Sequence, residues 1–440
     1  MKPYASYKPS GVPWLGDVPS EWVVEKLKFF AKFVGGGTPS KDEPAYWNGE
    51  IPWVSPKDMK RPLIRETEDF ITSEGLRNSP CALIPPRSVL TVVRSGILQH
   101  TIPVAINTVP VTLNQDMRAL IPDDRVESRY LAYQIEGCQK ALREEWVKQG
   151  ATVESIEHQR MVDSRLAVPA LDEQQAIADY LDAETARIDM LVQEKEELIG
   201  LLKEARSATI TEAVSRGLCP SVPLKSSGLH FLGNVPKHWK KFKVAHAFGT
   251  SSGTTPPTDE PKWYEGDVPW VQSSELRENV VFSTEKKVTV EAVQKFSALK
   301  IYPAGTLLLA MYGATIGRVG LLGVPATTNQ ACCALHPLGE ISTQFFCWWL
   351  QAYRDELVAR GYGGGQPNIS ATLISGMYFF APLPEEQQAI AEYLDDETAK
   401  IDALITHTQE EIALLKELRA ATIADAVLGR VDVRSLTQKQ

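Results

Sequence analysis

The stretch that decides the fold is EQQAIADYLDAETARID, which runs from Glu173 to Asp189 and recurs as EQQAIAEYLDDETAKID from Glu386 to Asp402. Near-identity over such a length, at an offset of 213 residues (386 minus 173), indicates an internal repeat. Each copy continues in apolar residues that step alternately by four and three, which predicts a long helix with a heptad-like stripe. A lone helix of this kind cannot bury its stripe, so we expect the two helices to pack together.

The apolar positions of this stripe are the ones we expect to pack in the helix pair or against partner proteins. They are Ile177, Leu181, Ile188, Leu191, Leu198, Leu202, Ile390, Leu394, Ile401, Leu404, Leu415 and Leu418. Polar residues interrupt the stripe, among them Lys195 in the first copy and Glu411 in the second.

The repeat extends upstream of the helices. LGDVPSEW (Leu15–Trp22) recurs as LGNVPKHW (Leu232–Trp239), DEPAYWNGEIPWV as DEPKWYEGDVPWV, and IPPRSVL (Ile84–Leu90) as IYPAGTL (Ile301–Leu307), all at an offset of 217. One unit, a globular head followed by a long helix, is therefore present twice. We predict head 1 over 1–168, a helix over 169–217, head 2 over 218–382, a second helix over 383–430 and a tail over 431–440.

The heads are predicted to be α+β domains with mostly antiparallel strands. Short β-branched runs at Ser88–Val93 and Thr306–Met311 end in glycine turns, which is typical of strands. The runs Ser128–Gly137 and Thr343–Val358 are predicted to be helical.

Composition indicates a folded cytoplasmic protein. The 440 residues are 43% hydrophobic and 23% charged, and no stretch approaches the roughly 20 apolar residues of a membrane span. The first residues, MKPYASYKPSG, contain no apolar signal-peptide core, and the six cysteines form no C-x-x-C pair. We expect reduced thiols and no metal site.

The net charge of −9 is unevenly distributed. Residues 171–217 carry −6 and residues 384–430 carry −7, whereas residues 1–170 carry 0, residues 218–383 carry +3 and residues 431–440 carry +1. The acidity therefore belongs to the helices, and the neutral to basic heads remain compatible with a nucleic-acid partner.

Catalytic motifs are missing. The sequence has no G-x-x-x-x-G-K-[ST] phosphate loop, no H-E-x-x-H, no G-x-S-x-G and no Asp/Asn-Pro-Pro-aromatic motif of adenine methyltransferases. The weak nuclease-like set Asp267 with Glu285-x-Lys287 has no counterpart in the first copy. We predict no catalytic residues, and a stand-alone metal-dependent nuclease stays open as an alternative.

The repeated EQQAIA-x-YLD-x-ETA-x-ID helices and the paired LG-x-VP-x-x-W motifs resemble the specificity subunit of a type I restriction–modification complex. The resemblance covers nearly the whole chain. It implies two target-recognition domains and two antiparallel helices that form a coiled-coil spacer in a pseudo-two-fold repeat. It also implies a non-catalytic, cofactor-free subunit that binds a bipartite, asymmetric site in double-stranded DNA.

The partners implied by the resemblance are two modification subunits and, through them, motor–nuclease restriction subunits. The former methylate adenine N6 with S-adenosylmethionine, and the latter use ATP and Mg²⁺. A protein-binding scaffold that does not contact DNA stays open as a second alternative.

Candidate DNA contacts are polar residues, because Arg, Lys, Asn and Gln read base edges and hold phosphates, and most of them lie in the segments where the two copies diverge most, 55–110 and 272–325. In head 1 they are Ser55, Lys57, Lys60, Arg61, Arg94, Ser95, Gln99, His100, Asn114 and Gln115. In head 2 they are Gln272, Ser273, Ser274, Arg277, Tyr312, Thr315, Arg318, Asn329, Gln330, Gln366 and Asn368. Asn114-Gln115 and Asn329-Gln330 occur in both copies, which favours a framework hydrogen bond over base reading.

Overall fold

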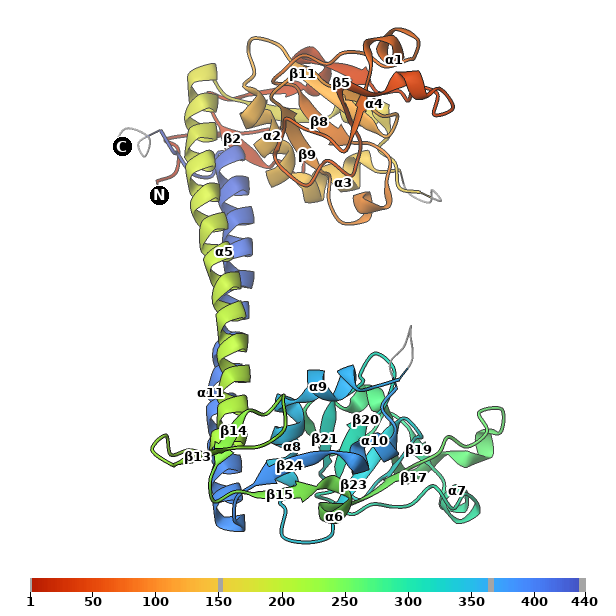
Figure 1. The fold of residues 1–440 in the computed structure, drawn as a ribbon. Coiled ribbons are helices and arrows are strands. Elements are labelled where there is room, and N and C mark those ends of the chain that lie inside the picture. The colour runs from red at the N-terminus through yellow and green to blue at the C-terminus, as the bar shows by residue number, and fades with distance from the viewer. Residues whose placement is uncertain (1, 149–152, 363–367, 435–440) are drawn as a thin grey trace. The chain divides into compact units, whose positions relative to one another are not determined.

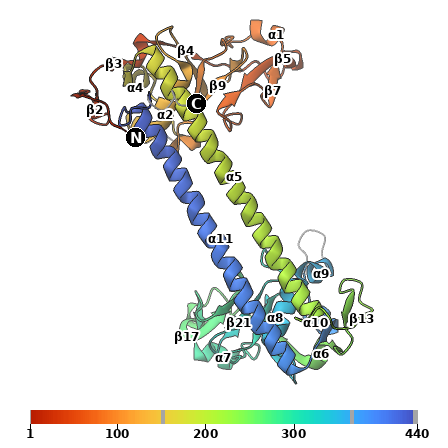
Figure 2. The same ribbon diagram turned by 90° about the vertical axis from the view of Figure 1, so that its left-hand side faces the viewer.

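The computed structural model describes residues 2–148, 153–362 and 368–434, and it divides into two compact units. Unit 1 comprises Met1–Glu196 and Glu410–Gln440, and unit 2 comprises Glu197–Gln409. The two long helices, α5 (Leu171–Arg216) and α11 (Pro384–Val427), each pass from one unit into the other (Figures 1 and 2). Each unit therefore consists of one head and part of both helices. Within the described residues, no helix is both long and apolar enough to cross a membrane.

The strands and helices of head 1 have their counterparts in head 2 in the same order. Those of head 1 are β1 (Tyr7–Pro9), β2 (Asp17–Pro19), β3 (Val23–Lys26), β4 (Ala31–Gly35), β5 (Trp47–Val54), β6 (Leu63–Ile64), β7 (Asp69–Ile71), α1 (Ser73–Arg77), β8 (Val89–Val92), β9 (Val104–Asn107), β10 (Thr112–Leu113), β11 (Met117–Pro122), α2 (Ser128–Gly137), α3 (Gln139–Trp146), α4 (His158–Asp163) and β12 (Arg165–Val168). Those of head 2 are β13 (Leu224–Ser226), β14 (Asn234–Pro236), β15 (Lys240–Lys243), α6 (Val244–Ala247), β16 (Phe248–Ser252), β17 (Tyr264–Val271), β18 (Asn279–Val281), β19 (Lys287–Val288), α7 (Val290–Lys295), β20 (Leu307–Ala310), β21 (Val319–Leu322), β22 (Thr327–Thr328), β23 (Cys332–Pro337), α8 (Thr343–Ala352), α9 (Arg354–Ala359), α10 (Ala371–Gly376) and β24 (Tyr378–Ala381).

A five-stranded sheet forms the centre of each head. Its strand order is β4-β11-β8-β9-β6 in head 1 and β16-β23-β20-β21-β18 in head 2, antiparallel except at the last pair. Each head also has a three-stranded sheet. Its order is β10-β5-β7 in head 1 and β22-β17-β19 in head 2, so the same strands pair in both heads. The heads are thus α+β domains with one shared topology, as predicted.

The core of each head includes the ends of both long helices. In unit 1, Trp22 and Tyr130 share a cluster with Ile177 of α5 and Val427 of α11. In unit 2, the corresponding cluster joins Trp239 and an aromatic group on α8 to residues at the end of α5 and the start of α11. Burial of apolar surface in these clusters, at roughly 25 cal/mol per Å², ties each head to the helix pair.

The apolar stripe is buried only in part. Ile177, Leu181, Ile188, Ile390 and Leu394 are buried, and Leu191, Leu202, Ile401 and Leu415 are half-buried. Leu198, Leu404 and Leu418 are 40%, 53% and 49% exposed, so their packing against partner proteins, the other half of the prediction, stays a prediction. These leucines stay exposed because two facing helices cover a narrower stripe than the apolar residues of each helix form.

Polar contacts between α5 and α11 repeat with the sequence. Arg419 donates to Asp189 at 2.9 Å in unit 1, and the equivalent Arg206 donates to Asp402 at 2.9 Å in unit 2. Lys195 meets Glu411 at 2.5 Å in unit 1, so two polar interruptions of the stripe pair with each other. In unit 1, the contact residue on α5 advances from Asp189 to Lys195 while its partner on α11 goes back from Arg419 to Glu411. The paired segments of the two helices are therefore antiparallel.

The repeated EQQ sequence attaches each long helix to its head. Trp22 Nε1 donates to Glu173 Oε1, and Trp239 Nε1 to Glu386 Oε1, both at 3.1 Å. The next residue, Gln174, accepts from the backbone N–H of Glu127 at 2.9 Å and donates to the carbonyl of Pro169 at 2.9 Å. Gln387 makes the same two kinds of contact in unit 2.

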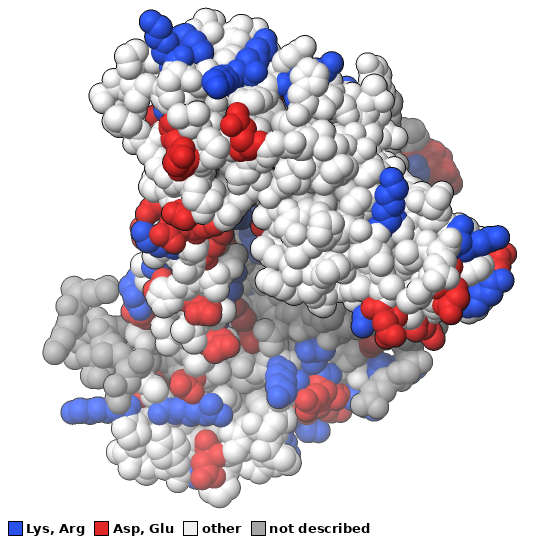
Figure 3. All heavy atoms as spheres, turned by 90° about the horizontal axis from the view of Figure 1, so that it is seen from below, with Lys and Arg blue, Asp and Glu red and all other residues white. Residues whose placement is uncertain are grey.

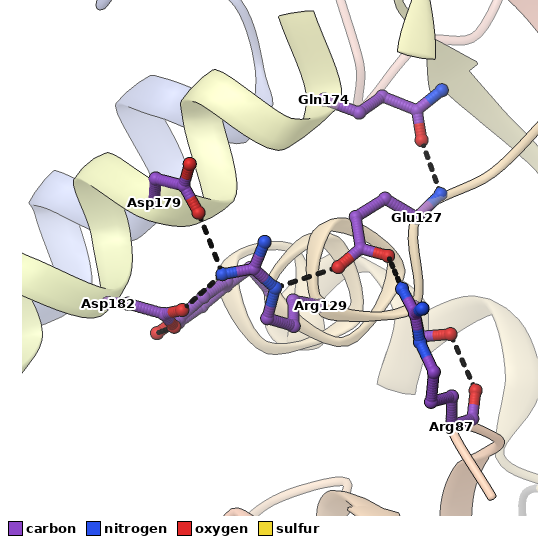
Figure 4. Close-up of polar contacts among 8 residues, drawn as sticks. Arg87, Glu127, Arg129, Gln174, Asp179 and Asp182 are labelled. Atoms are coloured by element: carbon purple, nitrogen blue, oxygen red, sulfur yellow. Dashed lines mark hydrogen bonds and ion pairs between the residues drawn. The ribbon is translucent and has the colours of Figure 1, made fainter. Parts of the chain in front are cut away.

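Glu127 is the centre of a charge network at this joint (Figure 4). Its side chain is 6% exposed and contacts Arg129 at 2.7 Å and Arg87 at 3.1 Å. Arg129 continues to Asp179 and Asp182 on α5 at 2.8 and 2.6 Å. Burial acts to raise the pKa of Glu127, but the two guanidinium groups outweigh it and hold that pKa below its ordinary value.

The strand register corrects one step of the repeat alignment. Val89 pairs with Leu120 and Leu307 pairs with Leu335, so the offset at β8 and β20 is 218 rather than 217. With this offset Arg87 matches Gly305, and both have a positive φ, 64° and 83°. The shared left-handed turn fixes the alignment of the two copies at this point, although the residue types do not reveal it.

The helix predicted over Thr343–Val358 is two helices, α8 and α9, separated at Tyr353. Tyr353 has φ −110° and ψ 24°, and Cys138 separates α2 from α3 in the same way. Neither residue is a glycine or a proline, so the residue type gives no signal of the break. The helix predicted over Ser128–Gly137 is confirmed.

The described part of the predicted tail packs against head 1. The end of α11 is closed by hydrogen bonds from Gly429 N to Ala426 O (3.2 Å) and from Arg430 N to Asp425 O (2.9 Å), with Gly429 at φ 67°. Val433 beyond it is fully buried. Gly217 ends α5 at φ 74°, where the chain continues directly into head 2.

We expect Gly429→Ala to destabilise unit 1 strongly. A positive φ costs a residue with a side chain about 1–2 kcal/mol. A Cβ at Gly429 would also lie 2.4 Å from the rigid Pro19 ring, which adds an overpacking cost of about 1–3 kcal/mol. Gly217→Ala is the matched control, because its Cβ would meet the movable Glu386 carboxylate at 3.0 Å. Thermal unfolding should show the larger loss for Gly429→Ala, and equal losses would contradict the role of Pro19.

The Glu127 network predicts a pH-dependent contribution to stability. Because the folded-state pKa of Glu127 is lowered, its stabilisation is complete above the ordinary value of 4.5 and is lost as the pH falls through the folded-state value. Glu127→Gln should cost about 2 kcal/mol at neutral pH, the scale of charged hydrogen bonds. In unfolding experiments from pH 7 to pH 3 the two proteins should converge at low pH. A constant difference would show that Glu127 is not titrating.

Candidate nucleic-acid interface

Two loops that differ between the heads extend from a shared turn. Loop L1 comprises residues 55–68 in head 1 and 272–285 in head 2, each with the short edge strand β6 or β18 inside it, and loop L2 comprises residues 94–101 and 312–318. L1 follows β5 or β17, and L2 follows β8 or β20. Most of the predicted DNA contacts lie in these loops.

The Asn-Gln turn holds the bases of both loops together. In head 1, Asn114 N donates to Val54 O at 2.9 Å, and Val93 N donates to Asp116 O at 2.8 Å. Head 2 repeats this with Asn329 N to Val271 O at 3.0 Å and Met311 N to Ala331 O at 2.8 Å. Val54 and Val93 directly precede L1 and L2, so the recurring turn is a framework element.

The side chains of this turn are occupied within each head. Asn114 Oδ1 accepts from Asp116 N at 3.0 Å, and Asn329 Oδ1 accepts from Ala331 N at 3.1 Å. Gln115 and Gln330 accept from Thr38 and Thr255. Asn114 is buried, so direct DNA reading by this side chain is not supported. Gly36 is required opposite it, because a Cβ there would lie 1.8 Å from Asn114 O.

A single carboxylate closes L1 in each head, which the sequence did not reveal. Asp58 accepts from Ser55 N at 2.8 Å and from Glu68 N at 2.9 Å. The equivalent Glu275 accepts from Gln272 N at 2.7 Å and from Glu285 N at 2.8 Å. Different sequences are therefore held on the same scaffold.

The L1 residues predicted to contact DNA differ in exposure. Lys57, Lys60 and Arg61 are exposed in head 1, whereas Ser55 is 6% exposed and donates its hydroxyl to Asp58, so the prediction that Ser55 reads DNA is not supported. In head 2, Ser274 and Arg277 are exposed, and Gln272 and Ser273 are half-buried.

Arginines on the short helices clamp L2, another feature missed from the sequence. Arg143 on α3 donates from Nε to Leu98 O at 3.0 Å and from Nη2 to Gln99 O. Arg354 on α9 donates from Nε and Nη2 to Ile316 O at 3.1 and 2.9 Å. The two arginines stand at different positions of equivalent helices, so the repeat comparison could not pair them.

The predicted L2 residues of head 1 are mostly at the surface. Arg94, Gln99 and His100 are exposed, and Ser95 is half-buried and accepts from Ile97 N. In head 2, Tyr312, Thr315 and Arg318 are half-buried, and Arg318 Nε is buried without a partner in the protein.

A third segment returns beside L2 in each head. Ile156 N donates to Val93 O, and the equivalent Ile369 N donates to Met311 O, both at 2.8 Å. Asn368 is exposed and pairs with Tyr362 in an isolated bridge. Gln366 lies outside the described residues.

Charge on the heads is divided into small groups. On the face shown in Figure 3, charged residues lie in small groups, several of which contain both signs, with broad uncharged surface between the groups. This face therefore carries no continuous basic band.

The nuclease-like set is not brought together as a metal site. Glu285 and Lys287 line a cavity of about 530 Å³ with Tyr264 and Trp270, and Asp267 is not among its lining residues. In the described part of the chain, no group of three or more His, Cys, Asp or Glu residues is placed to hold a metal ion.

Comparison with known proteins places this architecture in one family. The family model of the type I restriction modification DNA specificity domain matches twice, at residues 19–199 and 236–414. The type I restriction enzyme EcoR124I/EcoR124II specificity subunit of Escherichia coli is 42% identical over 163 residues, which is 37% of this chain and 40% of that protein. The MjaIX specificity subunit of Methanocaldococcus jannaschii is 24% identical over 435 residues, 96% of each chain.

Solved structures support the fold. A chain from a structural study of complex assembly and conformational transition of the type I R-M system has a TM-score of 0.75 at 15% identity, and the match covers 94% of this chain and 99% of that one. The HsdS subunit from Thermoanaerobacter tengcongensis has a TM-score of 0.57 at 15% identity, with 94% and 98% covered. Because the two family matches together span more than half of the sequence, this chain belongs to the family of type I restriction–modification specificity subunits.

Proposed function

We propose that this chain is the non-catalytic DNA-recognition subunit of its complex and that each head reads one half of a bipartite, asymmetric site in double-stranded DNA. The observation that carries this proposal is the contrast between frame and loops. The Asn-Gln turn, the L1 carboxylate and the head–helix joint repeat, whereas the exposed residues of L1 and L2 do not. A two-fold frame with two different readers suits two different half-sites.

The long helices are proposed to set the half-site spacing and to bind two adenine-N6 methyltransferase subunits. Exposed leucines on the helices support the second role, since apolar surface without a covering element marks an interaction site. Leu201 and Leu414 are equivalent in the repeat, and each is 64% exposed. A symmetric pair of such positions suits two copies of one partner. These partners would supply S-adenosylmethionine chemistry, and restriction subunits bound through them would use ATP and Mg²⁺.

The first test maps N6-methyladenine in the host genome with and without this chain. We expect one motif of two short half-sites separated by a spacer of constant length. The double substitution Lys60→Ala/Arg61→Ala in L1 should relax or abolish recognition in only one half. The same pair of substitutions should leave the sequence read in the other half unchanged.

Loss of both half-sites at once, with the complex still assembled, would contradict independent readers. Absence of any bipartite motif and of any DNA footprint would favour a scaffold that binds only protein.

The second test measures how many methyltransferase subunits bind. Leu201→Glu or Leu414→Glu alone should reduce the number bound from two to one, and the double variant should bind none, because a charge would have to be desolvated in an apolar interface. Thermal stability should hardly change, since both side chains are exposed. Leu338→Glu is the matched control, because Leu338 is 58% exposed but belongs to head 2 and to neither long helix. Mass photometry gives the stoichiometry, and two bound subunits in the double variant would overturn the docking surface.

A further inference from the structure

One row of residues across the central sheet of head 1 is unexpectedly polar. Gly35 on β4 pairs with Arg118 on β11, Arg118 pairs with Thr91 on β8, and Thr91 pairs with Val104 on β9. Directly paired residues present their side chains on the same face of a sheet, so these four residues form one line. The neighbouring line on this face, Phe33, Leu120, Val89 and Ile106, is wholly apolar.

The equivalent line in head 2 has no charged residue. Register matches Arg118 to Cys333, Thr91 to Leu309 and Val104 to Val319. Cys333, Leu309 and Val319 are all fully buried in the head 2 core. The shared fold therefore does not require an arginine at this position, and head 1 carries one for a reason of its own.

Two polar atoms in this line lack partners. Arg118 Nε and Thr91 Oγ1 are both buried without a hydrogen bond in the protein. Burial lowers the pKa of the Arg118 guanidinium, and no carboxylate offsets that effect. Within the described residues, Arg118 forms no ion pair, unlike Arg129 in the same head, which contacts three carboxylates. A half-buried guanidinium without a counter-charge is costly, which is a feature of sites that receive an anion.

His158, at the start of α4, completes the site. Its Nδ1 lies 3.3 Å from Arg118 Nη1, and its ring packs edge-on against Phe33 at 5.7 Å. Burial and the charge of Arg118 both lower the pKa of His158. A guanidinium can only donate, so Nδ1 must accept and the proton of the neutral ring lies on Nε2. The head 2 residue at this position is Ala371.

The site lies at the junction of L2 with the returning segment. Val93, which pairs with Ile156, immediately precedes Arg94, and Arg94 bridges to Ser155. His158 follows two residues after Ile156. On the other side of Arg118, a Cβ built at Gly35 would meet no atom within 4 Å, so the space there is open. β11, β8 and α4 can be followed in Figure 1.

We propose that Arg118 and His158 of head 1 form a phosphate-binding site that holds one backbone phosphate of the bound DNA and thereby positions L2 on its half-site. This inference rests on the proposed DNA-recognition function and adds a contact that head 2 lacks. A phosphate oxygen accepts from the Arg118 guanidinium, which His158 Nδ1 orients, and the phosphate supplies the counter-charge that the head does not provide. Gly35 leaves room for the approach.

DNA is favoured over a carboxylate of a partner protein by position. The site borders the loop that holds the exposed residues Arg94, Gln99 and His100, rather than the helix pair. The exposed apolar positions on the helices lie on separate elements. A phosphate contact fixes register without reading sequence, so one head can have it and the other can lack it.

The test uses the full chain assembled with its methyltransferase subunits. Binding to a duplex that contains the mapped target, and to an unrelated duplex, is measured against salt concentration for the native protein and for Arg118→Met. The slope of log K against log salt should fall by about 0.9, the value for one phosphate of B-form DNA. Affinity should fall about tenfold on both duplexes. Arg118→Lys should retain the slope, because it keeps the charge.

Stability separates this role from a structural one. Arg118→Met should unfold at an unchanged or higher temperature, because it removes an unpaired buried charge. Arg129→Met is the control, since loss of its three ion pairs should lower the unfolding temperature without changing the salt slope. If Arg118→Met does not fold, the triple variant Thr91→Leu/Arg118→Met/His158→Ala reproduces the apolar line of head 2 and gives the same readout.

Three results would overturn the phosphate site while leaving the proposed function intact. The first is an unchanged salt slope in Arg118→Met. The second is altered preference at one base of the target, which would make Arg118 a base reader. The third is loss of methyltransferase subunits from the complex, which would assign the site to a partner carboxylate. Failure of the native complex to bind any bipartite target would instead reject the proposed function itself.

Discussion

An indole N–H that donates to a glutamate in the first turn of a long helix holds each head in place. A buried indole can only donate, so it needs an acceptor, and a carboxylate is favoured at a helix N-terminus by the exposed amide groups and the helix dipole. Trp22 and Glu173 meet these conditions in unit 1, and Trp239 and Glu386 meet them in unit 2, both at 3.1 Å. Around each indole also lies the glycine that ends the other long helix, Gly429 or Gly217. One contact thus joins a head, the start of one helix and the end of the other.

This joint explains which residues repeat and which do not. The motif residues Gln174, Asp182 and Asp189 each contact something outside their own helix: a turn of the head, the head helix α2 and an arginine of α11. The loops L1 and L2 take no part in these contacts, and the Asn-Gln turn holds only the residues at which the loops begin. A frame that fixes loop ends but not loop contents permits each head to have its own exposed residues. Divergence between the copies is therefore concentrated in L1 and L2.

The sequence predicted what depends on periodic pattern and on near-identity between copies. The repeat, the two long helices, the α+β heads and the family all follow from such signals. It missed what depends on register and on packing. The offset of 218 at β8 is set by a left-handed turn at Arg87 and Gly305. These two residues are of different types, so the sequence alone does not match them. The exposure of Leu404 and the burial of Ser55 likewise depend on which neighbours cover them. The L2 clamps Arg143 and Arg354 occupy non-equivalent positions, so comparison of the copies could not find them.

The arginines of head 1 show how electrostatics separates frame from reader. Arg129 joins the head to α5 and is surrounded by Glu127, Asp179 and Asp182, so its charge is satisfied inside the protein. Arg118 lies in the central sheet beside L2, at a position where head 2 has a cysteine, and in the described part of the chain it forms no ion pair. A charge that serves folding alone is expected to be paired, because leaving it unpaired costs free energy and an apolar residue of similar size would serve as well. An unpaired charge next to a loop that is itself held in place is therefore best explained by a ligand from outside the chain.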